Sequence, residues 1–230
     1  MFEKINWSEI KTLEKKEKFE QIIWDAIKRI ECGGYNIGEG KTAKVCMLEE
    51  YPEACLKTIS EKTISKNRSH KEMEFLDLAS HHNLPVPKPI CSVETDDGKD
   101  YLFMETINGF SLEDLVNMDL FGDLPETFDF KKFFSELRVI VERMHEQRIY
   151  HRDLHWGNVL VDKEGKPIII DFGDATVNHL SSEDPYREIN AKGEMTLYQS
   201  DENRIAQVYK QVGTYLREKG FFEVKKGGDK

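Results

Sequence analysis

The stretch from residue 150 to residue 173 constrains the fold more than any other part of this chain. Two short apolar segments, residues 159–162 and 167–170, are separated by four residues of turn composition. Strands of this length joined by such a turn form an antiparallel hairpin. The hairpin would carry Asp171, at the end of its second strand, back to the residues that precede its first strand.

Three oxygen-bearing side chains stand at the ends of this hairpin. Asn158 precedes the first strand and Asp171 follows the second, so we expect their oxygens to share a hard cation. Magnesium suits such a site because it takes few protein oxygens and leaves its other positions to water and phosphate. Asp153, five residues before Asn158, can then accept a proton from an attacking hydroxyl. The pattern indicates a phosphoryl-transfer site, where catalysis depends mainly on positioning and charge neutralisation.

Two motifs within this stretch resemble the signature pair of the protein kinases. His-Arg-Asp-x-x-x-x-Asn runs from residue 151 to residue 158, and Asp-Phe-Gly follows at residues 171–173. The resemblance implies an α+β, bilobal protein-kinase-like fold with a small antiparallel-sheet N-lobe and a reduced, mostly helical C-lobe. It also implies ATP and Mg²⁺ as cofactors, with Asp153 as the catalytic base and with Asn158 and Asp171 as the metal ligands.

A glycine-containing segment nearer the N-terminus resembles the glycine-rich loop of that family. It reads Gly-x-Gly-x-x-Ala-x-Val, with alanine in place of the usual third glycine. The resemblance implies that Gly38 and Gly40 let backbone amides approach the phosphates and that Val45 covers one face of the adenine. A Walker A loop ending at residues 40–42 is a poorer match, because Tyr35 stands where its first glycine should lie.

The following strand supplies the predicted phosphate-binding lysine. Lys57 ends the sequence Ala-Cys-Leu-Lys, and we expect it to be half exposed on the strand. The resemblance implies that Lys57 holds the α- and β-phosphates and that Glu72 on the next helix orients it, with Glu74 as the alternative partner. Cys55 is assigned to the ATP site on the same resemblance.

A second predicted hairpin leads into the hinge between the lobes. The resemblance implies that Met104 is the gatekeeper and that the backbone from Glu105 to Ile107 faces the adenine edge. Leu160, in the first strand of the catalytic hairpin, is expected to contact the nucleotide as well.

His155 makes the acceptor class ambiguous. It replaces the lysine that protein kinases commonly carry two residues after the catalytic Asp, and we expect it to reach the transferring phosphoryl group. The loop His-x-Asp-Leu-His-x-Gly-Asn is similar to that of the aminoglycoside phosphotransferases, and it also resembles the loop of haspin. We expect a serine/threonine protein kinase, with a small-molecule kinase of the aminoglycoside-phosphotransferase type as the alternative. An ATP-binding pseudokinase scaffold is a third interpretation.

The segment after Asp171 departs from the protein-kinase pattern. No Ala-Pro-Glu triplet occurs between Asp174 and the end of the sequence, and the helix expected near residues 201–219 is followed only by a charged tail. We therefore expect a reduced C-lobe. In protein kinases the Arg equivalent to Arg152 meets a phosphorylated activation segment, and the candidate phosphorylation sites here are Thr176, Ser181, Ser182 and Tyr186.

The segment before the glycine-rich loop is predicted to be one amphipathic helix from about residue 6 to residue 30. Asn6 and Glu9 form a capping pair, and apolar residues recur at helical spacing. Such a helix either packs on its own N-lobe or docks a protein partner. We therefore divide the chain into the N-terminal helix (1–32), the N-lobe (33–107), the C-lobe (108–224) and the charged tail (225–230).

Composition narrows the classes of partner and compartment. The formal net charge of −10 argues against nucleic acid and against anionic membrane surfaces. The sequence contains no run of 18 apolar residues, which a membrane-spanning helix would require, so we expect a cytoplasmic protein. We expect its partners to be a nucleotide and a protein or small-molecule hydroxyl acceptor. The spacing of the four cysteines favours reduced, buried thiols over zinc ligands or disulfides: Cys32, Cys46, Cys55 and Cys91.

Overall fold

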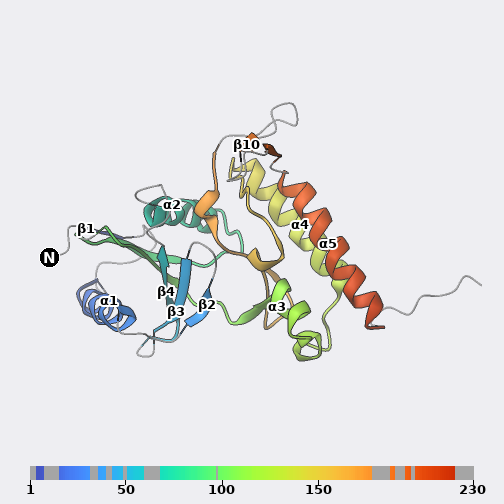
Figure 1. Ribbon diagram of the computed structural model, residues 1–230, viewed down its shortest axis with the longest axis horizontal. Helices are drawn as coiled ribbons and strands as arrows, with labels where there is room; N and C mark the ends of the chain where they lie inside the picture. Colours follow the sequence, from blue (N-terminus) through green and yellow to red (C-terminus); the bar gives the residue numbers. More distant parts are fainter. Residues whose placement is uncertain are drawn as a thin grey trace, which may run out of the picture. The chain divides into compact units, whose positions relative to one another are not determined.

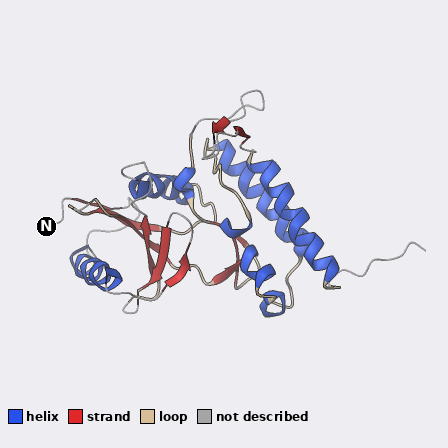
Figure 2. Cartoon of the chain, viewed as in Figure 1, coloured by secondary structure: helices blue, strands red, loops and turns tan. Residues whose placement is uncertain are grey.

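The chain divides into two compact units. The first contains residues 1–108 and 171–175, and the second contains residues 109–170 and 176–230. The computed structural model describes residues 4–7, 16–31, 36–39, 43–48, 51–59, 68–96, 98–177, 187–189, 195–197 and 200–220 (Figures 1 and 2). Among these residues, no helix combines the length and the apolar character that a membrane crossing requires.

The first unit is built on one antiparallel sheet of six strands. In spatial order the strands are β1-β5-β6-β4-β3-β2. Their bounds are β1 (Lys4–Trp7), β2 (Asn36–Glu39), β3 (Ala43–Met47), β4 (Ala54–Ile59), β5 (Pro89–Glu94) and β6 (Asp100–Glu105). Strands β4 and β5 are buried at all but one residue each, and β6 is buried over residues 101–103.

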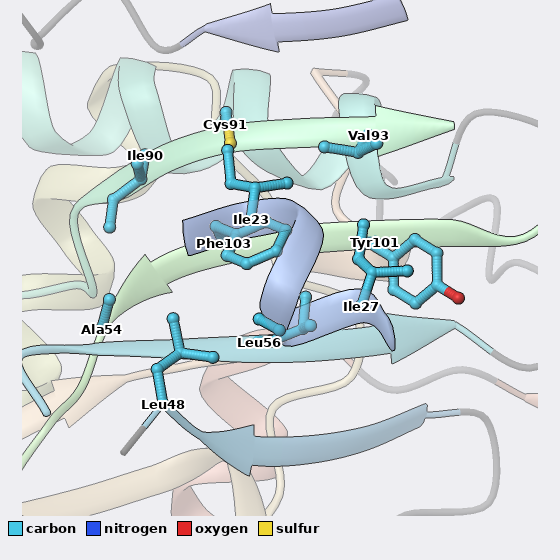
Figure 3. Close-up of a cluster of buried hydrophobic side chains, with 11 residues drawn as sticks. Ile23, Ile27, Leu48, Ala54, Leu56, Ile90, Cys91, Val93, Tyr101 and Phe103 are labelled. Carbon is cyan, nitrogen blue, oxygen red and sulfur yellow. The ribbon is translucent and has the colours of Figure 1, made fainter. Parts of the chain in front are cut away.

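Helix α1 (Lys16–Glu31) covers one face of this sheet. Figure 3 shows Ile23 and Ile27 reaching from α1 to Leu56 of β4 and Phe103 of β6. Ile23 and Ile27 are one helical turn apart, so they point the same way, and both are buried. Helix α1 therefore belongs to the core of the first unit, which is the local packing that the amphipathic pattern allowed.

The predicted single helix from about residue 6 is wrong at its N-terminal end. Residues 4–7 form strand β1, which extends the sheet by pairing antiparallel with β5, for example Ile5 with Val93. Ile5 and Trp7 alternate with polar neighbours and pack together against the core cluster. Apolar residues two apart share one face of a strand but lie on nearly opposite sides of a helix, and pairing with the edge of β5 supplies backbone hydrogen bonds that a frayed helix end would lack.

Helix α2 (Arg68–His81) lies on the other face of the sheet. Its first turn is fixed to β6, because the backbone N–H of Ser69 donates to Asp100 Oδ2 at 2.9 Å and the Ser69 hydroxyl donates to Asp100 Oδ1. Its buried side chains include Glu72, Met73 and Leu76. Glu72 therefore places a buried carboxylate on the face of the sheet opposite α1.

The second unit contains the predicted catalytic hairpin. Strands β7 (Gly109–Ser111), β8 (Val159–Asp162) and β9 (Pro167–Ile169) form a three-stranded antiparallel sheet. Val159 pairs with Ile169 and Val161 pairs with Pro167, so the hairpin predicted from two apolar segments and the turn between them is confirmed.

Helices carry the rest of the second unit. They are α3 (Leu112–Asn117), α4 (Phe130–Glu146) and α5 (Asp201–Glu218), joined by short 3₁₀ helices and a small β10 (Arg187–Ile189) and β11 (Met195–Leu197) pair. Helices α4 and α5 lie side by side (Figure 1), and Tyr209 of α5 packs against Phe130 and Phe134 of α4 with ring centroids 5.1 Å away. Side chains of Ser111, Asp129 and Ser200 cap the three helices. The predicted α+β organisation into two lobes is confirmed.

Candidate active site

Strand register brings four predicted nucleotide-binding residues to one face of the first unit's sheet. Val45 of β3 pairs directly with Lys57 of β4, and Cys55 pairs directly with Met104 of β6. Directly paired residues point to the same side of a sheet, and residues two apart on a strand do so as well. Val45, Cys55, Lys57 and Met104 therefore share the face opposite α1, where α2 also lies.

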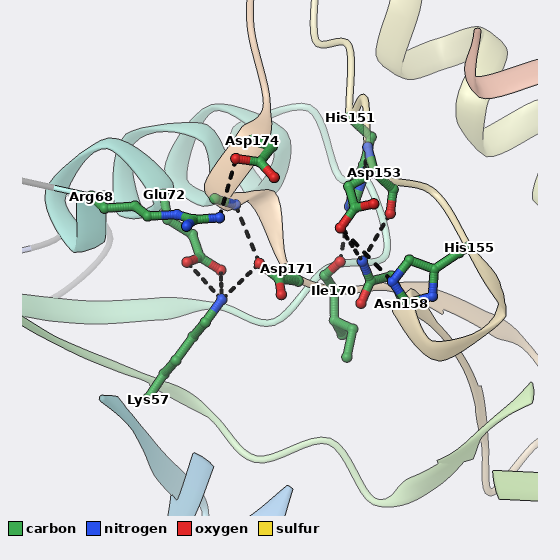
Figure 4. A network of polar contacts seen from close by, with 11 residues as sticks. Lys57, Arg68, Glu72, His151, Asp153, His155, Asn158, Ile170, Asp171 and Asp174 are labelled. Atoms are coloured by element: carbon green, nitrogen blue, oxygen red, sulfur yellow. Dashed lines mark hydrogen bonds and ion pairs between the residues drawn. The ribbon is translucent and has the colours of Figure 1, made fainter. Parts of the chain in front are cut away.

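Lys57 is held between two carboxylates on this face. Its Nζ lies 2.8 Å from Glu72 Oε1, 2.8 Å from Glu72 Oε2 and 2.8 Å from Asp171 Oδ1 (Figure 4). Glu74, the alternative partner, is exposed and lies 3.5 Å from His70 instead. The expectation of a half-exposed lysine is wrong, because Lys57 is only 5% exposed. Its stem lies under α2, which the strand pattern alone does not reveal.

The electrostatics of this cluster favour a charged lysine. Burial acts to lower the pKa of Lys57, but the carboxylates of Glu72 and Asp171 outweigh that effect and raise the pKa above its ordinary value. The Lys57 ammonium group can therefore neutralise a negatively charged ligand on this face of the sheet without first binding a proton.

Asp171 sits in a left-handed backbone conformation, with φ 64° and ψ 71°. Non-glycine residues rarely adopt it, and such torsions persist where the surroundings hold them. The backbone N–H of Gly173 donates to Asp171 Oδ1 at 3.4 Å, and the 3₁₀ helix η4 (Phe172–Asp174) follows. Asp174 then pairs with Arg68 Nη2 of α2 at 3.1 Å. The Asp-Phe-Gly turn is thus attached to α2 through Asp174 and to β4 through Asp171.

The predicted adenine-binding residues lie at the end of β6. The backbone N–H of Glu105 donates to Lys88 O, and the Glu105 carbonyl accepts from Cys55 Sγ at 3.7 Å. Burial raises the pKa of the Cys55 thiol to about 12, so it stays protonated as a donor. Met104 and Ile107 are partly exposed.

The glycine-rich loop is described only in part. The backbone of Gly38 lies in β2 opposite Val45 of β3. Gly40 lies outside the described residues, so the approach of this loop to phosphate stays a prediction. Cys46, Cys55 and Cys91 are buried, and Cys32 falls outside the described residues.

The second unit places Asp153, His155 and Asn158 together. Asn158 Nδ2 donates to the backbone carbonyl of Asp153 at 2.8 Å and lies 3.5 Å from Asp153 Oδ2 (Figure 4). His155 Nε2 lies 3.8 Å from the same Asp153 oxygen. The Asp153 side chain is 41% exposed, so a proton acceptor is presented to solvent on a loop whose neighbours hold its backbone.

The backbone fixes which nitrogen of His155 can donate. The N–H of Gly157 donates to His155 Nδ1 at 3.1 Å. A neutral imidazole with an accepting Nδ1 carries its proton on Nε2, and this is the nitrogen nearest Asp153. A side chain at Gly157 would displace the ring, because a Cβ built there would lie 2.8 Å from His155 Cε1.

A buried carboxylate anchors the backbone of this loop. Asp201, at the start of α5, accepts from the N–H groups of His151 at 2.8 Å and Arg152 at 2.9 Å, and it pairs with His145 Nε2 at 3.0 Å. Burial acts to raise the pKa of Asp201, but the hydrogen bonds from His145 and the loop outweigh it, so the pKa is lowered. His151 in turn donates through Nε2 to the carbonyl of Ile170 at 2.9 Å.

The two predicted metal ligands belong to different units, so the shared magnesium site stays a prediction. Each residue by itself fits a hard cation. Asn158 uses Nδ2 toward the acceptor atoms of Asp153, which leaves Oδ1 as its ligand atom. Asp171 supplies a carboxylate beside the positive charge of Lys57. Among the described residues, no cluster of three or more His, Cys, Asp or Glu side chains could hold a metal.

The structure gives the positions of Leu160 and Thr176, and their predicted roles stay predictions. Leu160 lies in β8 between Ser111 and Ile168, half buried. Thr176 exchanges backbone hydrogen bonds with Tyr150 at 2.9 Å in both directions. The other candidate phosphorylation sites lie outside the described residues: Ser181, Ser182 and Tyr186.

Sequence reasoning missed three polar residues that complete these clusters. Arg68 and His145 belong to none of the recognised motifs, so their partners could not be identified. Asp201 was noticed at a helix start, where a carboxylate is expected from the helix dipole alone. Its burial was the missing information, because a buried acid needs partners that an exposed one does not.

Comparison with known proteins shows similarity to protein kinases. The family described as the protein kinase domain matches residues 34–198. Sperm motility kinase 3A from Mus musculus is 34% identical over 143 residues, which are 61% of this chain and 27% of that protein. Testis-specific serine/threonine-protein kinase 1 from Mus musculus is 31% identical over 150 residues, covering 61% and 39%. CBL-interacting serine/threonine-protein kinase 16 from Arabidopsis thaliana is 29% identical over 151 residues, covering 60% and 31%. The matched part spans less than half the length of each relative.

Proposed function

The chain belongs to the protein kinase domain family, and on this premise we propose that it is a phosphotransferase that moves the γ-phosphoryl group of ATP to a hydroxyl. Its acceptor on this proposal is a serine or threonine side chain of a protein. The names of two similar proteins, both serine/threonine-protein kinases, support that acceptor class.

One observation carries the proposal. Lys57 is buried beside Glu72 and Asp171, with all three contacts at 2.8 Å. Burying a lysine is unfavourable without partners, and a hydrophobic residue would fill a strand position at lower cost. A lysine retained there supplies a fixed positive charge on the sheet face that carries Val45, Cys55 and Met104. Phosphoryl transfer needs such a charge next to the nucleotide phosphates.

On this proposal, each residue of the site has a separate role in the reaction. Lys57 binds phosphate oxygens, and Glu72 orients it. Magnesium, when bound, would neutralise the charge that develops on the phosphates, and Asn158 Oδ1 and the Asp171 carboxylate are the atoms that would hold it. Asp153 accepts the proton of the attacking hydroxyl, and Asn158 keeps the Asp153 backbone in place through its 2.8 Å hydrogen bond.

A small-molecule acceptor is the second candidate, and His155 favours it. The ring is held by Gly157 and points Nε2 toward Asp153, so an imidazole in a fixed orientation stands where protein kinases commonly have a flexible lysine. A compact acceptor could be enclosed by such a fixed ring more readily than by a lysine. His155→Lys tests this difference: a protein-kinase-like site should tolerate the lysine, whereas a small-molecule site should be obstructed by it.

Radiolabelled ATP with magnesium tests the function directly. The full chain is incubated alone, with generic protein acceptors and with pooled small hydroxyl compounds, and the labelled product identifies the acceptor class. Asp153→Asn should bind ATP but lose transfer by about 10²- to 10⁴-fold, the usual contribution of a positioned base. Wild-type turnover by Asp153→Asn would indicate a nucleotide-binding scaffold instead.

A further inference from the structure

Arg68 and Glu72 occupy successive turns on one side of α2. Residues four apart on a helix are neighbours, so the two side chains lie next to each other. Glu72 contacts Lys57, which contacts Asp171, while Arg68 Nη2 lies 3.1 Å from Asp174 Oδ1 (Figure 4). Arg68 of α2 therefore contacts Asp174 directly, whereas Glu72 of α2 is linked to Asp171 through Lys57 of β4.

The Arg68 side chain is built into the first unit. It is only 12% exposed, whereas Asp174 is 58% exposed. A Cβ built on Gly173 would lie 2.8 Å from Arg68 Nε and 2.9 Å from Nη2. The guanidinium thus passes directly over the backbone of Gly173, which has room for it because glycine lacks a side chain.

The position of Arg68 in α2 is unfavourable unless the arginine has a partner elsewhere. Arg68 is the first residue of the helix, and the first turn contains no acidic residue. The positive end of the helix dipole repels a cation there. Asp174 offsets this repulsion, and Asp100 holds the start of the helix to β6 through Ser69, so the guanidinium is presented from a fixed point.

We propose that Arg68 is a positioning residue for phosphoryl transfer. By pairing with Asp174 across Gly173, it keeps the Asp171 turn against α2 and so keeps Asp171 and Glu72 on Lys57. The effect on transfer rests on the proposed function, whereas the effect on the turn does not.

The test is a set of charge variants in the full chain. Arg68→Gln should lower kcat/KM for ATP about 5-fold, the upper range for a solvent-screened ion pair. Asp174→Asn should do the same. The exchanged pair, Arg68→Glu with Asp174→Arg, should recover most of the loss, as a double-mutant cycle requires for two groups that act on each other. Arg68→Lys should retain part of the activity, because it keeps the charge without the planar fork.

Lys71→Gln is the matched control, because it removes one positive charge from the same turn of α2 at an exposed position. It should leave kcat/KM unchanged. Equal effects of Arg68→Gln and Lys71→Gln would overturn the proposal, and so would an exchanged pair no better than either single variant.

Hydrogen exchange without nucleotide separates this proposal from the proposed function. The Ala175 N–H, bonded to Phe172 O at 3.0 Å, should exchange about 5-fold faster in Arg68→Gln than in wild type or Lys71→Gln. If the wild type shows no transfer but this difference appears, the proposed function fails and the positioning contact stands. Unchanged exchange in Arg68→Gln overturns the positioning contact, whatever the activity.

Discussion

The two units hold their predicted catalytic residues by different means. In the first, side chains hold side chains: Lys57 is fixed by Glu72 and Asp171 through ion pairs of 2.8 Å. In the second, one buried carboxylate holds backbone: Asp201 accepts the N–H groups of His151 and Arg152.

Because of this difference, the two units are sensitive to different changes. Ion pairs between side chains depend on charge state and can be exchanged for other charges, such as those of a phosphate. Backbone hydrogen bonds to a buried acid cannot be replaced in that way, and losing them leaves buried N–H groups without an acceptor. The first unit is therefore suited to binding a charged ligand, and the second to keeping a loop in one conformation.

Asp201→Ala should have the largest effect on stability. It removes the acceptor of two backbone N–H groups and one of the two carboxylates that lie 3.0 Å from His145. Breaking buried charged networks in this way costs about 3 to 5 kcal/mol in the free energy of unfolding. Urea unfolding measures it, and Glu202→Ala is the control, because Glu202 also contacts His145 but is exposed. Equal losses for the two variants would contradict the anchoring role of Asp201.

Lys57→Met should destabilise less, by about 1 to 3 kcal/mol, because Glu72 can take up a proton when its partner is removed. Burial raises the pKa of Glu72, so the folded variant binds a proton that the unfolded chain releases. Its stability should then fall as the pH rises from 5 to 8. Unfolding measured at both pH values tests this, with Lys44→Met on the neighbouring strand as the exposed control. A loss that is independent of pH would show that Glu72 stays charged.

His145→Asn should have the smallest effect on the free energy of unfolding, about 1 kcal/mol or less. The effect should be visible only as a change in the pH dependence of stability. Burial acts to lower the pKa of His145, but Asp201 and Glu202 raise it above its ordinary value. A raised folded-state pKa stabilises the protein below about pH 6.5, and the contribution disappears as the pH rises through the folded value. Wild type should therefore lose stability between pH 6 and 8.5, and the variant should not. Parallel curves for the two proteins would exclude this role.

Local patterns predicted the helices and hairpins of the described chain well where one signal dominated. The two apolar segments and the turn between them predicted the β8–β9 hairpin, and the helix expected near residues 201–219 matches α5. Residues 4–7 were mispredicted because their pattern is too short to separate a strand from a helix. Pairing with β5, which begins more than 80 residues later, decided the outcome, and local propensity contains no such information.

The candidate site was predictable in residue types but not in environment. Motif spacing selected Lys57, Glu72 and Asp153, and strand register places Val45 and Met104 on the same face of the sheet as Lys57. Burial was not predictable, since Lys57 was expected to be half exposed. Contacts such as Arg68 with Asp174 depend on which helix lies over which turn, and that follows only from tertiary packing.

The short excursion of residues 171–175 limits how this chain can be divided. The polypeptide leaves the second unit after Ile170, contributes five residues to the first unit, and returns at Thr176. A fragment ending at Asn108 would retain Lys57 and Glu72 but would lack Asp171 and the partner of Arg68. The first unit is therefore discontinuous in the gene, and no single truncation, fusion or domain exchange transfers its charged cluster intact.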